Sequence, residues 1–180
     1  MNKIKRQWDW SYNMNKNDIL RRIRYIFDLS DSEMISVFGQ ADYEVSRGQV
    51  SDWLKKDDDP ACKKCTDTQL AIFLNGFINH KRGKREGSQS EPEQILNNNA
   101  ILKKLKIAVN FKAEDMIRVL SLAGLQIPKH ELSAFFRKPG HKHYRECKNQ
   151  MLRNFLKGLQ LELRPGEDES EDPWGNLRLP

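Results

Sequence analysis

The residues of this chain that could bind a metal ion lie in two segments. Cys62 and Cys65 form a single C-x-x-C pair, and His141, His143 and Cys147 follow in the second segment. Zinc takes three or four Cys, His or carboxylate ligands, so the cysteine pair does not make a site by itself. Only Cys65 has a cysteine counterpart, at Cys147, and this position suits a small packing residue. The pattern therefore favours no metal and no cofactor, unless the two segments converge in the fold.

Residue spacings typical of catalysis are not found in the chain. It has no P-loop, no dinucleotide fingerprint, no nucleophile elbow and no H-E-x-x-H motif. The acidic run from Asp57 to Asp59 lacks the alternating ligands of a calcium loop and favours a solvated turn. We therefore expect a protein that is not an enzyme.

The chain contains an internal repeat that must position these residues. Residues 15–83 align with residues 97–165 at a constant offset of 82, without a gap, and 16 of the 69 aligned pairs are identical. Apolar residues recur at helical spacing in both copies. Units of this size bury too little surface to be very stable alone. The repeat predicts an all-α fold of two pseudo-symmetric helical repeats, about four helices each, packed together.

Local signals support four helices in each repeat. Ser30 with Glu33, and Ser46 with Gln49, have the spacing of capping boxes that begin a second and a third helix. The fourth helix carries Gly76 in the first repeat and Gly158 at the matching position in the second. Glycine inside a helix costs roughly 1 kcal/mol relative to alanine, so its occurrence in both copies predicts close helix–helix contacts there.

Charge and composition divide the chain into five parts. These are an N-terminal extension (residues 1–14, with Met14 as a candidate natural start), the first repeat (15–83), a flexible linker (84–96), the second repeat (97–163) and an acidic disordered tail (164–180). The net charge is 0 for residues 15–83 and +8 for residues 97–163. No apolar leader and no stretch of membrane-spanning length occurs, and three cysteines fit a reducing compartment. We expect a cytoplasmic protein.

Residues 33–56 are typical of a helix-turn-helix unit, whose recognition helix would begin at Ser46. Its first residues would place Arg47 and Gln49 towards the major groove, and the second repeat would offer Lys129 and His130. The connection between the helices is longer than the standard turn. The pattern therefore favours the alternative, in which this helix only contributes core residues.

Basic residues also follow one another in the first helix of each repeat. These are Arg21, Arg22 and Arg24 in one and Lys103, Lys104 and Lys106 in the other. Opposite an apolar stripe, they form either a phosphate-contacting surface or an ordinary solvated face. The predicted partner is DNA or RNA, bound mainly by the basic second repeat, and the alternative is an adaptor that docks an acidic protein. The candidate nucleic-acid-binding residues are Arg47, Gln49, Lys103, Lys104, Lys129, His130 and Arg137.

Several segments resemble an uncharacterised bacterial family, the YehS-like proteins. They are residues 17–25 (Asn-Asp-Ile-Leu-Arg-Arg-Ile-Arg-Tyr), 73–76 (Phe-Leu-Asn-Gly), 97–99 (Asn-Asn-Asn), 102–105 (Leu-Lys-Lys-Leu) and 144–147 (Tyr-Arg-Glu-Cys). The resemblance covers about residues 15–163. It implies a bacterial cytoplasmic protein and, because the family has no known function, it implies no active site.

Overall fold

The computed structural model describes residues 14–166, and these residues form eight helices and no strand. None of the eight is long and apolar enough to cross a membrane. The prediction of an all-α fold is confirmed. The helices are α1 (Lys16–Ile26), α2 (Asp31–Gly39), α3 (Arg47–Leu54), α4 (Asp67–Arg82), α5 (Asn98–Ala108), α6 (Ala113–Leu122), α7 (Lys129–Ala134) and α8 (Asn149–Leu163).

The first four helices and the last four correspond to one another in sequence position. Both predicted capping boxes, at Ser30 and Ser46, are formed. The turns correspond too, because Asp28 and its counterpart Asn110 adopt the left-handed backbone conformation, with φ angles of 52° and 56°. Asp and Asn tolerate this conformation better than other non-glycine residues. The ungapped repeat therefore extends to the backbone of the turns.

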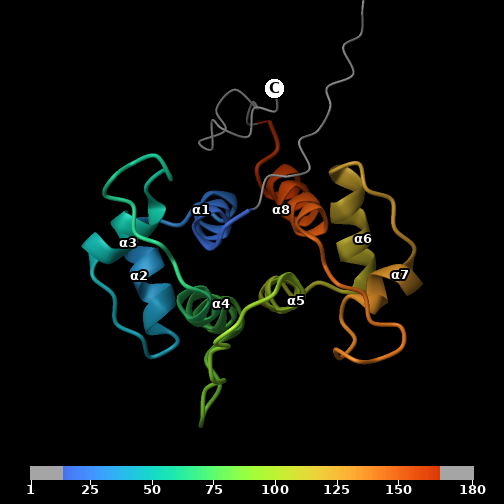
Figure 1. The fold of residues 1–180 in the computed structure, drawn as a ribbon, viewed down its shortest axis with the longest axis horizontal. Helices are drawn as coiled ribbons and strands as arrows, with labels where there is room; N and C mark the ends of the chain where they lie inside the picture. Colours follow the sequence, from blue (N-terminus) through green and yellow to red (C-terminus); the bar gives the residue numbers. More distant parts are fainter. Residues whose placement is uncertain (1–13, 167–180) are drawn as a thin grey trace, which may run out of the picture.

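The two repeats pack together by exchanging partners. The first helix of each repeat lies against the fourth helix of the other, so that α1 contacts α8 and α5 contacts α4. In Figure 1 these four helices occupy the centre of the molecule, with α2 and α3 on one flank and α6 and α7 on the other. The predicted contact between two pseudo-symmetric repeats is confirmed.

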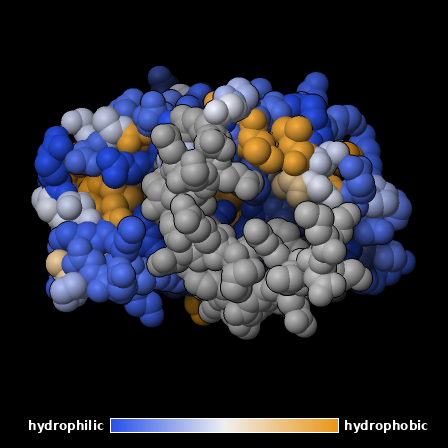
Figure 2. All heavy atoms as spheres, turned by 90° about the horizontal axis from the view of Figure 1, so that it is seen from above, coloured by the Kyte–Doolittle hydropathy of each residue, from blue (hydrophilic) through white to orange (hydrophobic). Residues whose placement is uncertain are grey.

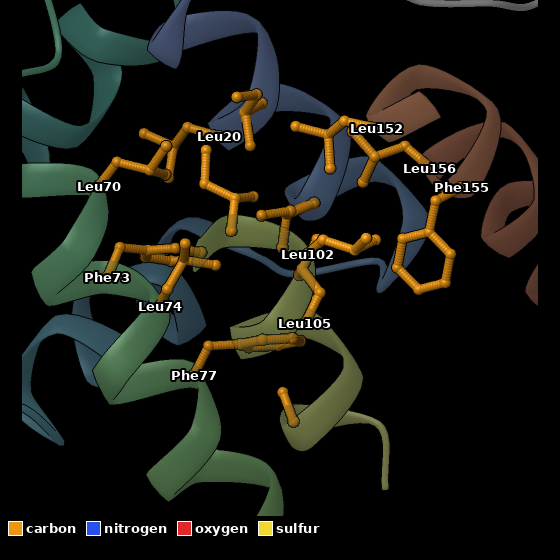
Figure 3. Packing of buried hydrophobic residues seen from close by; sticks show 14 of the residues in the cluster. Leu20, Leu70, Phe73, Leu74, Phe77, Leu102, Leu105, Leu152, Phe155 and Leu156 are labelled. Atoms are coloured by element: carbon orange, nitrogen blue, oxygen red, sulfur yellow. The ribbon is translucent and has the colours of Figure 1, made fainter. Parts of the chain in front are cut away.

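The centre of the molecule is a single hydrophobic core to which both repeats contribute. Figure 3 shows leucine and phenylalanine side chains from α1, α4, α5 and α8 meeting between the four helices. Leu20 and Leu102, at equivalent positions, are both fully buried. Apolar burial contributes about 25 cal/mol per Å² removed from water. Because much of this area is buried across the boundary between the repeats, each repeat depends on the other.

Two glycines allow the fourth helix of each repeat to touch the second. A Cβ atom added to Gly76 would lie 1.9 Å from the carbonyl oxygen of Val37, and one added to Gly158 would lie 2.0 Å from that of Val119. Real Cβ atoms do not approach backbone oxygens so closely, and Val37 and Val119 are themselves equivalent. The predicted close helix contacts at both glycines are confirmed.

A buried asparagine in α1 binds the chain on either side of the segment between α3 and α4. The side-chain amide of Asn17 donates to the carbonyl oxygens of Trp53 and Lys63, both at 2.8 Å. Its own oxygen accepts the backbone N–H of Cys65 at 2.9 Å. All three groups leave water on folding, so the hydrogen bonds replace those lost to solvent.

Asn99 in α5 repeats this arrangement. Its amide donates to the carbonyl oxygens of Phe135 (2.9 Å) and Arg145 (2.8 Å), and its oxygen accepts the N–H of Cys147 at 2.9 Å. The segment from residue 135 to residue 148, which joins α7 to α8, is thereby tied to α5 near both of its ends. We call this segment the α7–α8 loop.

The connector between α4 and α5 is held against α4. Asn79 of α4 donates to the side chain of Gln89, and the N–H of Leu96 donates to Asp67 at 2.9 Å. Leu96 is buried, and its carbonyl oxygen accepts from Lys16. The connector is therefore attached to α4 at several points, in contrast to the flexible linker that its polar composition predicts.

Most of the predicted N-terminal extension and acidic tail lies outside the described residues. The exceptions are Met14, which is buried, and residues 164–166. The Arg164 guanidinium lies 4.2 Å from the centre of the Tyr25 ring and donates to the Tyr25 carbonyl oxygen. This contact joins the end of α8 to the end of α1.

Replacing Gly158 by leucine should lower the free energy of unfolding, typically by 1–3 kcal/mol, because the new side chain overpacks the contact with Val119. Gly158→Ala should also destabilise, because its single Cβ already collides with backbone. Urea denaturation measures both effects.

The matched control is Gly39→Ala in α2, where an added Cβ meets no atom within 4 Å. There we expect no loss of stability, or a gain of up to about 1 kcal/mol from helix propensity. Equal unfolding midpoints for Gly158→Ala and the parent protein would show that the close contact is not needed.

Asn99→Asp should destabilise at neutral pH by about 3 kcal/mol or more, because a carboxylate cannot donate to the two carbonyl oxygens. Burial beside those oxygens raises the folded-state pKa of the new carboxyl. The variant's free energy of unfolding should therefore fall, relative to the parent, as the pH rises above about 4, the carboxyl pKa of the unfolded chain.

Urea denaturation at several pH values checks this. Exposed Asn110, whose counterpart in the first repeat is Asp28, provides the control: Asn110→Asp should change stability little at any pH. A loss of stability in Asn99→Asp that is the same in acid and at neutral pH would contradict the assigned hydrogen bonds.

Candidate nucleic-acid interface

The predicted recognition residues of the first repeat are engaged within their own repeat. Arg47 donates to Asp31 and to Ser32 at the start of α2, both at 3.2 Å. The Gln49 side chain accepts the N–H of Ser46 at 2.8 Å and so completes the capping box of α3. These contacts favour the interpretation of α3 as a core helix, since its Trp53 is buried.

The second repeat places its counterparts in a shorter helix. Lys129, at the start of α7, pairs with Glu114 of α6 at 2.6 Å, while His130 beside it is exposed. Helix α7 has only six residues. Lys129 and Arg47 thus play the same part in their repeats, because each ties the third helix to the start of the second.

The arginines of α1 do not form a surface for phosphates. Arg21 and Arg22 are each only 7% exposed. Arg21 donates to Asp18 and to the carbonyl oxygen of Lys55, and pairs with Asp57 at 3.1 Å. Burial alone lowers the pKa of Arg21, but the hydrogen bonds to the two carboxylates outweigh it and the pKa is raised. Neither predicted alternative for this cluster, phosphate-contacting or solvated, holds for Arg21 and Arg22, because helices pack on both sides of α1.

In α5 the equivalent lysines have separate roles. Lys104 is nearly buried and pairs with Glu93 at 3.1 Å, so it belongs to the contact between α5 and the connector. The Lys106 ammonium lies 5.5 Å from the ring centre of Phe136 in the α7–α8 loop. Lys103, one turn before Lys106, is exposed and pairs with no carboxylate among the described residues.

The reason that Lys103 is unpaired lies in the sequence of the second repeat. Lys103 is the counterpart of Arg21. The counterparts of its two partners, Asp18 and Asp57, are Ala100 and Pro139. The second repeat therefore keeps the cation and lacks both carboxylates that neutralise it in the first.

The α7–α8 loop continues this difference. In residues 55–66 of the first repeat, four lysines accompany the three aspartates Asp57 to Asp59. In the equivalent residues 137–148, five cations accompany Glu146 alone, and all five are exposed. Comparison of the two aligned loops, rather than any single motif, was the signal that could have identified these residues. The loop cations are Arg137, Lys138, Lys142, Arg145 and Lys148.

Lys106 joins the two sets of cations, because it stands over Phe136, the neighbour of Arg137. We call the combined surface the basic face, made of Lys103, Lys106 and the five loop cations. Of the predicted site residues, Lys103 and Arg137 belong to this face, one in α5 and the other in the loop that Lys106 contacts. Lys104 faces the connector instead. Lys129 and His130 lie at the start of α7, whereas the α7–α8 loop follows the end of that helix. Arg47 and Gln49 belong to the first repeat.

A small groove lies beside the basic face, with a cavity volume of about 220 Å³. Phe135 and Met151 contribute apolar lining to this groove. Its charged lining residues are Arg145, Lys148, Glu131 and Glu146. Arg145 pairs with Glu131 at 3.1 Å, and Lys148 pairs with Glu146. Exposed pairs of this kind are weak, so the two cations can exchange partners readily. The other lining residues are Leu125, Gln126, Ile127, Gln150 and Asn154.

Two of the three cysteines, Cys65 and Cys147, are buried at equivalent positions of the two repeats. Burial raises the pKa of Cys65 and of Cys147 to about 12, so both stay protonated thiols at neutral pH. No group of three or more His, Cys, Asp or Glu residues within residues 14–166 could hold a metal ion. Cys65 and Cys147 instead present their backbone N–H groups to Asn17 and Asn99.

Hydrophobic residues do not gather into one large surface on the face that Figure 2 shows. Hydrophilic residues cover most of both ends of the molecule, and the hydrophobic areas are small and separate. The exposed large apolar residues come from different elements, among them Ile107 of α5 and Leu122 of α6.

Comparison with known proteins identifies relatives but no activity. The chain is 40% identical over 147 residues to the uncharacterized protein YehS of Escherichia coli (strain K12), which covers 81% of this chain and 94% of that protein. No solved structure matches. The model of the family described as protein of unknown function (DUF1456) matches twice, at residues 16–83 and 98–165, and so follows the two structural repeats. The resemblance inferred from the sequence is confirmed: the chain belongs to the DUF1456 family.

Proposed function

We propose that this protein binds nucleic acid through the basic face of its second repeat and is not an enzyme. The observation that carries the proposal is the loss, in the second repeat only, of the carboxylates that neutralise the equivalent position of the first. Asp18 and Asp57 hold Arg21 in the first repeat, whereas Lys103 is exposed beside a loop with five cations. Clustered lysines and arginines that outnumber the nearby carboxylates attract phosphate groups.

The position of the basic face supports the same proposal. The α7–α8 loop is held by Asn99 near both ends, so its cations are presented on a fixed backbone rather than on a free chain. A fixed loop loses less conformational entropy on binding than a free one. The protein would act as a binding module in regulation, in which the first repeat stabilises the fold and the second makes the contacts.

The alternative partner is an acidic protein, which the same cations would attract. A pull-down from cell lysate with and without nuclease treatment separates the two. Loss of the captured partners after nuclease treatment supports nucleic acid, and partners that survive it support an adaptor. The charge of the face does not distinguish them, because both associations are electrostatic.

The triple variant Lys103→Ala, Arg137→Ala, Lys138→Ala should weaken binding of a labelled oligonucleotide, measured by fluorescence anisotropy at several salt concentrations. Each phosphate contact that is lost should flatten the dependence of log affinity on log salt by about one unit, because fewer counterions are released. We expect the triple variant to flatten it by about three.

The matched control uses exposed cations of the loop in the first repeat, Lys56→Ala, Lys63→Ala and Lys64→Ala. It removes the same charge and should change binding much less. Arg21, Arg22 and Lys104 are unsuitable for this purpose, since they are buried or nearly so. Equal losses in the two triple variants, or no binding by the parent protein at low salt, would overturn the proposal.

A further inference from the structure

We infer that the nucleic acid bound by the basic face is single-stranded, and that one unstacked base enters the groove beside the face. This inference rests on the proposed function, because the same cations would hold the phosphates. In this inference the protein contacts the bases of the nucleic acid as well as its phosphates. The argument comes from the rings in the α7–α8 loop, from the groove and from the difference between the repeats.

Rings and cations alternate along the α7–α8 loop. His141 and His143 are exposed with their ring centres 5.7 Å apart, and Tyr144 beside them is half-buried. Lys142 and Arg145 lie within the same short stretch of chain. Proteins that bind single strands combine a positive groove for the backbone with rings on which bases stack. In a duplex the base faces cover one another, so such rings have nothing to stack on.

The groove has the chemistry expected for one base. Its apolar lining consists of half-buried Leu125 and Ile127 with Phe135 and Met151, which are only 5% and 7% exposed. The guanidinium of Arg145 lies 5.4 Å from the ring centre of Phe135. Its volume of about 220 Å³ is smaller than the roughly 300–1,000 Å³ of pockets for drug-sized ligands, which suits a single planar ring system. The side-chain amides of Gln126, Gln150 and Asn154 also line it. Gln126 donates to Ser121 and Gln150 donates to Asn154, and the remaining amide groups can hydrogen-bond to the edge of a base.

The first repeat lacks these features at the equivalent positions. Where the second repeat has His141, His143 and Tyr144, the first has Asp59, Ala61 and Cys62. The rings therefore accompany the basic residues of the same loop, of which Arg145 and Lys148 pair with Glu131 and Glu146. Helix α7 has only six residues, and Lys129 at its start is paired with Glu114. The second repeat therefore has little with which to read the major groove of a duplex.

Fluorescence anisotropy with labelled oligouridylate, oligothymidylate and a DNA duplex of the same length tests the inference on the full chain. We expect both single strands to bind about tenfold or more tightly than the duplex, because stacking adds to the phosphate contacts. Equal affinity for single strands and duplex would overturn the inference and leave the proposed function intact. No binding of any of the three would overturn the proposed function itself.

Two variants test the rings and the groove separately. His141→Ala with His143→Ala should lower single-strand affinity about tenfold without changing the salt dependence, since no lysine or arginine is removed. His80→Ala, an exposed histidine of α4, is the control. Gln126→Trp should fill the groove and lower single-strand affinity, while Glu44→Trp at the equivalent position of the first repeat should not.

Thermal unfolding of each variant establishes that it folds. Unchanged single-strand affinity in both the histidine variant and Gln126→Trp would overturn the inference, because bases would then contact neither rings nor groove. Ultraviolet cross-linking of an oligonucleotide containing 5-bromouridine gives an independent result. Cross-links within residues 125–154 support the inference, and cross-links confined to the first repeat overturn it.

Discussion

The side-chain amide of one buried asparagine in each repeat is the interaction on which the rest of the structure depends. Asn99 joins α5 to the end of α7 and to the approach to α8, and Asn17 does the same in the first repeat. An asparagine amide has two N–H donors and an acceptor oxygen, and here they bind two carbonyl oxygens and one N–H. These hydrogen bonds fix the shape of the loop before the fourth helix of each repeat. In the second repeat the fixed loop is the α7–α8 loop, which carries the cations.

The two repeats share a scaffold and differ in how its charges are neutralised. Arg21 lies between Asp18 and Asp57, so in the first repeat this cation is neutralised within the fold and stabilises it. Lys103 stands at the same place with neither partner, and the loop beside it has Pro139 and Gly140 in place of aspartates. Such a difference leaves the apolar residues of the shared core in place, although Asp18 and Arg21 of the first repeat are buried and Lys103 of the second is exposed. A duplicated fold can thus acquire a binding face in one copy while the other copy supplies the packing.

Much of the fold could be predicted from the sequence, because the repeat shows each helix twice. Gly76 and Gly158 reveal a close contact only when they are compared, since one glycine alone would carry little weight. The burial of Arg21 and Arg22 could not be predicted. Helical periodicity identifies one apolar stripe, but Arg21 is covered by the chain that follows α3, where it donates to the Lys55 carbonyl oxygen and pairs with Asp57. The periodicity of α1 does not show a contact with residues so far along the chain. The role of Asn17 was missed for a related reason, because its three partners lie far along the chain.

The exchange of partners also limits how the candidate site could be recognised. Among the predicted residues, Lys103 lies one turn before Lys106, and Arg137 follows Phe136, whose ring Lys106 contacts. Lys104, the next residue along α5, turns towards Glu93 and Asn75. Adjacent lysines on one helix therefore serve different purposes, one facing solvent and one facing the neighbouring repeat. Because α5 is held by α4 and α8 together, the orientation of Lys103 is set by residues of both repeats. The basic face belongs to the second repeat in sequence, but helices of both repeats hold α5 in place.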